Sequence, residues 1–234
     1  MSSISFQNLV KTYRDVTAVD GLTANIEAGR ITGFLGPNGA GKSTALRCLL
    51  GLASATSGEA LIEGKPYSHL DQPLKKVGAV LDSSGFNGAL TAGQNLRVIC
   101  AAAGISTDAI PRLLKLVELD HATRKRTRGY SLGMKQRLSL AAALLGDPDI
   151  LVLDEPANGL DPIGIAWLRD FLRNLASGGK TVLVSSHQLA EMQHTVDDVI
   201  IINHGKLIAA GPIGEVTQGQ TLEEAFMRLI GVAK

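Results

Sequence analysis

Hydrophobic residues form short continuous runs along the chain, and these runs alternate with segments of helical spacing. One run, residues 31–35, leads directly into a glycine-rich loop, and the apolar spacing of residues 42–50 is helical, with Gly51 as its stop. Three further runs, typical of strands buried on both faces, follow at residues 150–153, 181–184 and 199–202. Because strands and helices alternate, we expect an α/β fold with a largely parallel sheet and helices packed against it.

The first part of the chain alternates apolar and polar residues in short strand-like pieces. The apolar positions that share this spacing are Ile4, Phe6, Leu22, Ala24 and Ile26. Residues 61–62 and 77–81 predict two further strands. From about residue 89 to 145 the pattern becomes helical, and Thr91 and Gln94 have the spacing of a capping box at the start of a helix.

The end of the chain predicts a last helix. Thr221 and Glu224 have capping-box spacing ahead of several apolar residues, so we expect a helix over about 221–232 that packs against the rest of the protein. No internal repeat or low-complexity linker interrupts the sequence. We therefore expect residues 1–234 to form a single domain.

Composition fits a compact soluble protein and excludes several other classes. Hydrophobic residues make up 45% of the chain, and 23 Lys and Arg against 22 Asp and Glu leave a net charge of +1, too little to hold a nucleic acid or an anionic membrane. No apolar run approaches the roughly 18 residues of a membrane helix, and the N-terminus lacks the features of a signal peptide. Cys48 and Cys100 cannot form a disulfide scaffold, so we expect buried thiols in a reduced, cytoplasmic setting.

The strongest functional motif is the glycine-rich loop that precedes the helix at 42–50. It matches the complete pattern G-x-x-x-x-G-K-[ST] and consists of Gly36, Pro37, Asn38, Gly39, Ala40, Gly41, Lys42, Ser43 and Thr44. Glycines allow backbone N–H groups to turn inward around phosphate oxygens, and the helix N-terminus adds a favourable partial charge. We expect Lys42 to reach the β- and γ-phosphates of a nucleotide and the Ser43 hydroxyl to coordinate Mg²⁺.

Two acidic residues and a histidine follow two of the buried strands. Asp154 and Glu155 come directly after the run at 150–153, which places their carboxylates at the carboxyl end of the sheet, where ligands of α/β folds bind. We expect Asp154 to join the Mg²⁺ shell and Glu155 to polarise an attacking water; the alternative is that both acids cap a strand on the surface. His187, after the run at 181–184, can hydrogen-bond a γ-phosphate, or else be an ordinary packed or surface histidine.

Two further motifs identify a family. Residues 130–137, Tyr-Ser-Leu-Gly-Met-Lys-Gln-Arg, lie shortly before Asp154, and residues 157–161 follow it. They look like a signature motif and a D-loop, and with the phosphate loop and His187 they make nearly the whole chain resemble the ATP-binding subunits of ABC transporters. The resemblance implies a P-loop NTPase (RecA-like) core with a mostly parallel sheet, an N-terminal antiparallel β subdomain and a helical signature subdomain at about residues 89–145.

The resemblance also implies how the site is completed. In this family two subunits form a head-to-tail dimer around two ATP molecules, so that the phosphate loop of one chain faces the signature of the other. Ser131 and Gly133 would then present a hydroxyl and backbone N–H groups to the partner's γ-phosphate, and Asp161 matches the acidic position of the D-loop. Tyr13 falls where the family keeps an aromatic residue that stacks on adenine; the alternative is a tyrosine packed at a strand end.

The chain departs from the family pattern at two places. Leu132 and Met134 stand where the commonest signature has glycine and glutamine, and this resembles the branch that exports drugs, antibiotics and lantibiotics. Asp82 stands where most members have a glutamine that binds Mg²⁺ and signals to the membrane partner. A carboxylate still binds Mg²⁺ through oxygen, so we expect Asp82 to keep this role.

The implied function is an ATPase subunit that binds ATP and Mg²⁺ and drives a separate membrane-spanning permease. A second ATPase subunit, expected to be an identical copy, completes the dimer, and the permease holds it at the cytoplasmic face of the cell membrane.

Two alternative functions are disfavoured by the sequence, and one basic segment has two interpretations. A soluble ABC ATPase acting on ribosomes or nucleic acid is disfavoured by the single domain and the net charge of +1, and a regulatory module that only senses ATP is disfavoured by the intact Glu155 and His187. The basic run at residues 124–128 is interpreted as a solvated loop, with acidic groups of a partner or lipid headgroups as the alternative contact.

Overall fold

The central feature of the fold is a six-stranded sheet. The structure, a computed structural model, describes residues 2–81 and 85–231. In spatial order the strands are β5 (Val77–Val80), β6 (Ile150–Asp154), β7 (Thr181–Ser186), β3 (Ile31–Leu35), β8 (Asp198–Asn203) and β9 (Lys206–Pro212). All neighbours from β5 to β8 are parallel and β9 alone runs antiparallel to β8, which confirms the largely parallel sheet expected from the sequence.

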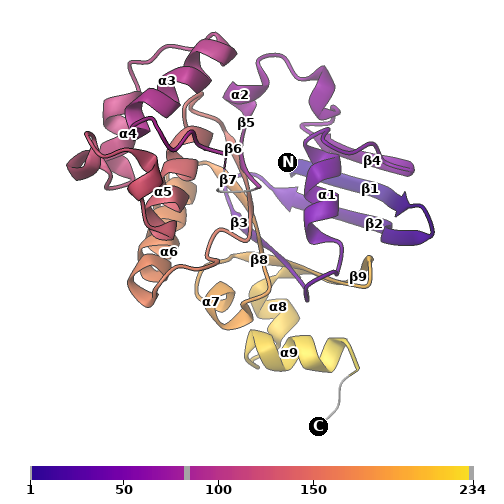
Figure 1. Ribbon diagram of the computed structural model, residues 1–234. Helices are drawn as coiled ribbons and strands as arrows, with labels where there is room; N and C mark the ends of the chain where they lie inside the picture. The colour runs from indigo at the N-terminus through magenta and orange to yellow at the C-terminus, as the bar shows by residue number, and fades with distance from the viewer. Residues whose placement is uncertain (1, 82–84, 232–234) are drawn as a thin grey trace.

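A second, three-stranded sheet is antiparallel throughout. Its strands, in spatial order, are β2 (Val16–Glu27), β1 (Ser2–Tyr13) and β4 (Ser57–Ile62). The helix α1 (Lys42–Leu49) packs in one apolar cluster with this sheet and with one face of the central sheet. The antiparallel β subdomain implied by the family resemblance is therefore present, and it fixes the position of α1 (Figure 1).

Helices cover the other face of the central sheet. Figure 1 shows α3 (Ala92–Ala103), α4 (Ile110–Leu116), α5 (Leu132–Ala143) and α6 (Pro162–Ser177) on the side opposite α1. In β6, Leu151 and Leu153 join the core beneath these helices, whereas Ile150 and Val152 join the core that contains α1. Because successive strand residues point to opposite faces, burial on both faces explains the continuous apolar run.

Shorter elements complete the fold. They are α2 (Pro73–Lys76), α7 (Leu189–Gln193), α8 (Ile213–Thr217), α9 (Leu222–Leu229) and 3₁₀ turns at Tyr67–His69, Asp120–Ala122 and Thr127–Gly129. The structure confirms both capping boxes: the Thr91 hydroxyl accepts from the Gln94 N–H, and the Thr221 hydroxyl accepts from the Glu224 N–H. In each box the longer side chain in turn accepts from the N–H of the threonine.

Three features near the end of the chain differ from the expectation or are missed by it. The last helix ends at Leu229, short of the expected 221–232, because the backbone leaves the helix at Ile230 and Gly231 has a left-handed φ of 75°. The patterns do not predict the short helix α8. They also miss β9, since its largely half-exposed residues at the sheet edge do not form an apolar run.

Both cysteines are buried, as the sequence predicts. Cys48 lies in α1 and Cys100 in α3, and burial raises the pKa of each thiol. A raised pKa keeps the thiol protonated and unreactive. These two residues therefore act as small core side chains.

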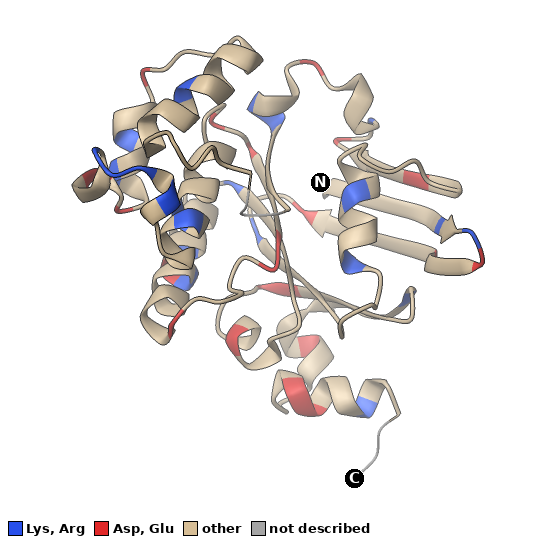
Figure 2. Cartoon of the chain, in the orientation of Figure 1, with Lys and Arg blue, Asp and Glu red and all other residues tan. Residues whose placement is uncertain are grey.

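Charged side chains of both signs are spread over the molecule. Figure 2 shows acidic residues on α7, α8 and α9 and a basic stretch beside α5. In the basic run Arg124, Lys125, Arg126 and Arg128 are exposed, while Thr127 is buried and its hydroxyl donates to Asn87 O at 2.9 Å. Within the described ranges, no helix has both the length and the apolarity needed to cross a membrane.

Candidate functional site

Three neighbouring parallel strands bring the predicted site residues to one edge of the central sheet. The order β6-β7-β3 places the ends of these strands side by side, with Asp154 opposite Ser185 and Leu35 opposite Ser186 in the register. The glycine-rich loop follows β3, the acidic pair ends β6, and His187 directly follows β7. This carboxyl edge is where α/β sheets bind their ligands.

The glycine-rich loop has a backbone that excludes side chains at two of its positions. A Cβ atom on Gly36 would lie 2.3 Å from Ile202 O, and one on Gly41 would lie 2.2 Å from Ala18 O. Gly41 also has a left-handed φ of 103° and is the N-cap of α1. Glycine is thus required for the loop to fit between β8 and β2 and enter α1.

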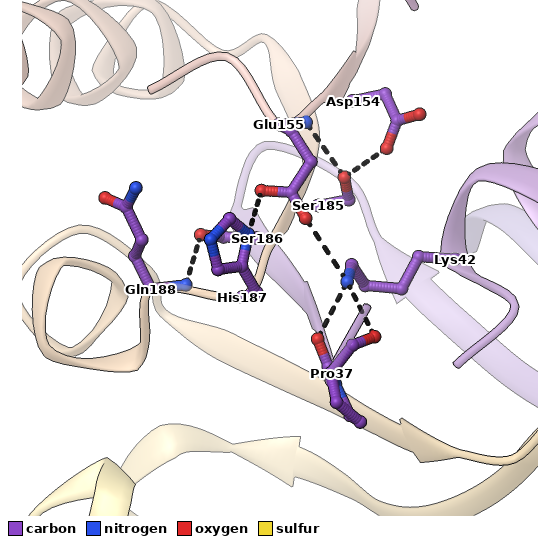
Figure 3. Close-up of polar contacts among 9 residues, drawn as sticks. Pro37, Lys42, Asp154, Glu155, Ser185, Ser186, His187 and Gln188 are labelled. Atoms are coloured by element: carbon purple, nitrogen blue, oxygen red, sulfur yellow. Dashed lines mark hydrogen bonds and ion pairs between the residues drawn. The ribbon is translucent and has the colours of Figure 1, made fainter. Parts of the chain in front are cut away.

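The Lys42 ammonium group connects the loop with the acidic pair. It donates to Gly36 O at 2.7 Å and Pro37 O at 3.3 Å, and it lies 3.2 Å from Oε1 of Glu155 (Figure 3). Lys42 is only 5% exposed. An ammonium group has three N–H donors, and these three oxygens account for all of them.

Glu155 is held at both carboxylate oxygens. Oε2 lies 2.8 Å from Nδ1 of His187, and Oε1 faces Lys42. The Glu155 backbone has a left-handed φ of 50°, which is sparsely populated for residues other than glycine. Such strain persists only where the surroundings over-determine the conformation, and it clusters at functional sites. Its geometry therefore favours a chemical role over the alternative of a surface strand cap.

Ser185 joins the two acidic residues. Its fully buried hydroxyl donates to Oδ1 of Asp154 at 2.5 Å and accepts from the Glu155 N–H at 2.9 Å (Figure 3). No sequence motif singles out this serine. The available signal is a hydroxyl residue inside an otherwise apolar strand, but its contacts depend on β7 lying beside β6.

The signature residues and the D-loop form a second group, on the helical side of the sheet. Ser131 is the N-cap of α5 and accepts from the Met134 N–H at 3.2 Å, and Asp161 is the N-cap of α6 and accepts from the Gly164 N–H at 2.7 Å. Both residues line a cavity of about 340 Å³ together with Gly133. The structure therefore does not bring these residues into the cluster around Lys42 within one chain.

Tyr13 is the last residue of β1 and is 45% exposed. The Lys11 ammonium lies 4.6 Å from the centroid of its ring. The ring is thus exposed at the surface at the end of β1, and its stacking on adenine stays a prediction.

The candidate metal ligands are only partly within the described residues. Ser43 lies in the first turn of α1 and Asp154 at the end of β6, whereas Asp82 lies outside the described residues. Among the residues that the structure describes, no group of three His, Cys, Asp or Glu side chains forms a metal site. One hydroxyl and one carboxylate suit Mg²⁺, which keeps several waters and binds through few protein oxygens together with substrate phosphates.

Comparison with known proteins gives one family and several similar proteins. The family model described as ABC transporter matches residues 19–158. The lantibiotic transport ATP-binding protein SrtF of Streptococcus pyogenes is 40% identical over 223 residues, covering 95% of this chain and 95% of its own. The bacitracin transport ATP-binding protein BcrA of Bacillus licheniformis is 44% identical over 212 residues, covering 89% of this chain and 69% of its own.

A solved structure has the same fold. The ATP-binding subunit of an ABC transporter superposes with a TM-score of 0.87 at 25% identity, covering 98% of this chain and 100% of that one. The fold of an ABC transporter ATP-binding subunit is therefore matched over 98% of this chain.

Proposed function

Because this chain belongs to the ABC transporter family, as an ATP-binding subunit that hydrolyses ATP, we propose that the cluster of Lys42, Glu155 and His187 is its catalytic centre. The observation that supports this is the pair of contacts at Glu155, 3.2 Å to the Lys42 ammonium and 2.8 Å to the His187 ring. The Glu155 carboxylate is thus held between Lys42, which is suited to bind phosphate, and His187, which is suited to hydrogen-bond a γ-phosphate and the attacking water. This arrangement fits phosphoryl transfer to water.

Nucleotide binding changes the partners of Lys42. All three of its donors are used by Gly36 O, Pro37 O and Glu155, so an incoming phosphate has to replace at least one of them. The Glu155 carboxylate is the partner that ATP displaces, because its negative charge repels the phosphate, whereas the two loop carbonyls carry no net charge. Glu155, still held by His187, is then free to accept a proton from an attacking water.

The remaining nucleotide contacts come from the loop and the strand edge. The loop from Gly36 to Thr44 surrounds the phosphates with backbone N–H groups, and the exposed Tyr13 ring stacks on adenine. Ser43 and Asp154, with Asp82 as a third candidate, would hold the Mg²⁺ that accompanies ATP. Bound there, the ion neutralises negative charge on the phosphates, and Ser185 keeps the Asp154 carboxylate in place.

A second subunit completes each site. Ser131, Gly133 and Asp161 lie on a surface apart from Lys42, which fits a head-to-tail dimer in which they meet the partner's nucleotide. This chain carries both half-sites, which permits two identical copies to pair. The dimer acts on a membrane-spanning permease and is held by it at the cytoplasmic face of the membrane.

The transported substrate is a drug, antibiotic or peptide that is exported. This proposal follows from the names of the relatives. Two are ATP-binding proteins for lantibiotic transport and bacitracin transport, and a third, from Burkholderia orbicola at 38% identity, is a Nod factor export ATP-binding protein. The permease, not this chain, selects the substrate.

A pull-down tests the transport function. Tagged protein is recovered in parallel from detergent-solubilised membranes and from the soluble fraction, with untagged protein as the control. We expect a protein with several membrane spans to co-purify from the membranes. Recovery of only ribosomes, nucleic acid or soluble proteins would contradict the proposal and favour a non-transport ATPase.

Replacing Asp82 by Ala tests its proposed role in Mg²⁺ binding and coupling. We expect ATP hydrolysis by the complex with its permease to require more Mg²⁺ and transport per ATP to fall, since an oxygen ligand is lost. The control is Asp71→Ala, which removes an exposed carboxylate nearby in the sequence. Unchanged hydrolysis and transport in Asp82→Ala would remove Asp82 from the site.

A further inference from the structure

Gly159 lies in the turn between β6 and α6 and touches the first residue of α5. A Cβ atom on Gly159 would lie 2.1 Å from Cδ2 of Leu132, far inside the distance of about 3.5–4.0 Å that two carbon atoms prefer. The Gly159 backbone is also left-handed, with φ of 72°. The leucine side chain therefore occupies the space that any side chain at position 159 would need.

The same turn meets α5 at a second place. A Cβ atom on Gly133 would lie 3.5 Å from Cδ2 of Leu160, which is an ordinary contact. At its start the turn is tied to the candidate catalytic residue, since the Asn158 N–H donates to Glu155 O at 3.1 Å. The turn thus has a defined shape and contacts the first turn of α5 through two adjacent residues.

Leu132 stands between the two residues that are expected to meet the partner's nucleotide. Leu132 is 47% exposed, and it lines the same cavity as Ser131, Gly133 and Gly159, so the direction of its side chain affects access to the face formed by Ser131 and Gly133. We propose that Gly159 is a positioning residue: it seats the Leu132 side chain against the turn and keeps that face open for the partner's γ-phosphate. This inference rests on the head-to-tail dimer of the proposed function.

The exposure of Leu132 decides how a substitution at Gly159 acts. The clashing atom is the end of a flexible, half-exposed side chain, which can rotate away without moving the backbone. Gly159→Ala therefore pushes the leucine outward instead of unfolding the turn. The expected defect lies in dimer formation and turnover, with little change in ATP binding to the single chain, because that binding uses the phosphate loop.

The test compares Gly159→Ala with a glycine that has the same backbone strain and no neighbour. Gly64 has φ of 77° and nothing within 4 Å of a Cβ atom, so Gly64→Ala reports strain alone. We expect both variants to lower Tm by similar amounts. Only Gly159→Ala should lower kcat, by about tenfold or more, since a misplacement of about 1 Å can cost 10²-fold in rate. In a Glu155→Gln background, Gly159→Ala should also reduce the fraction of protein that dimerises with ATP.

A second variant separates the leucine from the backbone. In a Leu132→Ala background the clash is gone, so Gly159→Ala should change kcat by less than about twofold. An equal loss of kcat in both backgrounds, or no loss in either, would overturn the inference. Such a result contradicts only the inference about Leu132 if the unsubstituted chain hydrolyses ATP and the Glu155→Gln chain dimerises with ATP. If neither hydrolysis nor dimerisation occurs, the proposed function itself fails.

Discussion

Glu155→Gln should bind ATP and accumulate as an ATP-bound dimer while its turnover falls by about 10²–10⁴-fold, the contribution typical of a general base. The substitution preserves the shape of the side chain. Its amide oxygen can still accept from Lys42, and its amide N–H can donate to Nδ1 of His187, so the cluster keeps its geometry. What is lost is the negative charge that accepts a proton from water.

Steady-state hydrolysis, nucleotide binding and size-exclusion chromatography with ATP measure the three parts of this result. Glu59→Gln is the matched control, because Glu59 is an exposed carboxylate on β4, and it should behave as the unsubstituted protein. Normal turnover in Glu155→Gln would remove Glu155 from catalysis. Loss of ATP binding would instead assign it a structural role in holding Lys42.

Much of the central sheet can be predicted from the sequence because its strands are buried on both faces. Burial on both faces requires an apolar side chain at almost every position, as in β6 and β7, and such runs stand out against amphipathic helices. The capping boxes at Thr91 and Thr221 are equally local signals. β9 carries no such signal, since an edge strand that is half exposed tolerates mixed residues.

The site is predictable in its residues but not in its contacts. The phosphate loop and the acidic pair follow strands in the chain, yet more than one hundred residues separate Lys42 from Glu155. Their contact depends on the spatial order β6-β7-β3, which differs from the order of the strands in the sequence. The hydrogen bonds of Ser185 and the packing of Leu132 on Gly159 depend on the same arrangement and were therefore missed.

Lys42→Ala should weaken ATP binding by about 10²-fold, because hydrogen bonds to charged groups contribute about 1.5–3 kcal/mol and every 1.4 kcal/mol is about tenfold in affinity. Lys42 neutralises Glu155 and donates to two loop carbonyls. Without it, the unpaired Glu155 carboxylate faces the phosphates directly, so repulsion adds to the lost attraction. The backbone N–H groups of the loop alone do not offset both effects.

The control for this prediction is Lys206→Ala. Lys206 is 67% exposed and pairs with the exposed Asp20 at 3.4 Å, so its removal tests the loss of a lysine without the loss of the site. Calorimetric titration with ATP should show unchanged affinity in Lys206→Ala and an affinity lowered by about 10²-fold in Lys42→Ala, while both circular dichroism spectra stay native. The fold is expected to tolerate Lys42→Ala because Glu155 retains His187 and is 18% exposed. ATP affinity preserved in Lys42→Ala would contradict the displacement of Glu155 by phosphate, since the ammonium would then not be the group that the nucleotide recruits.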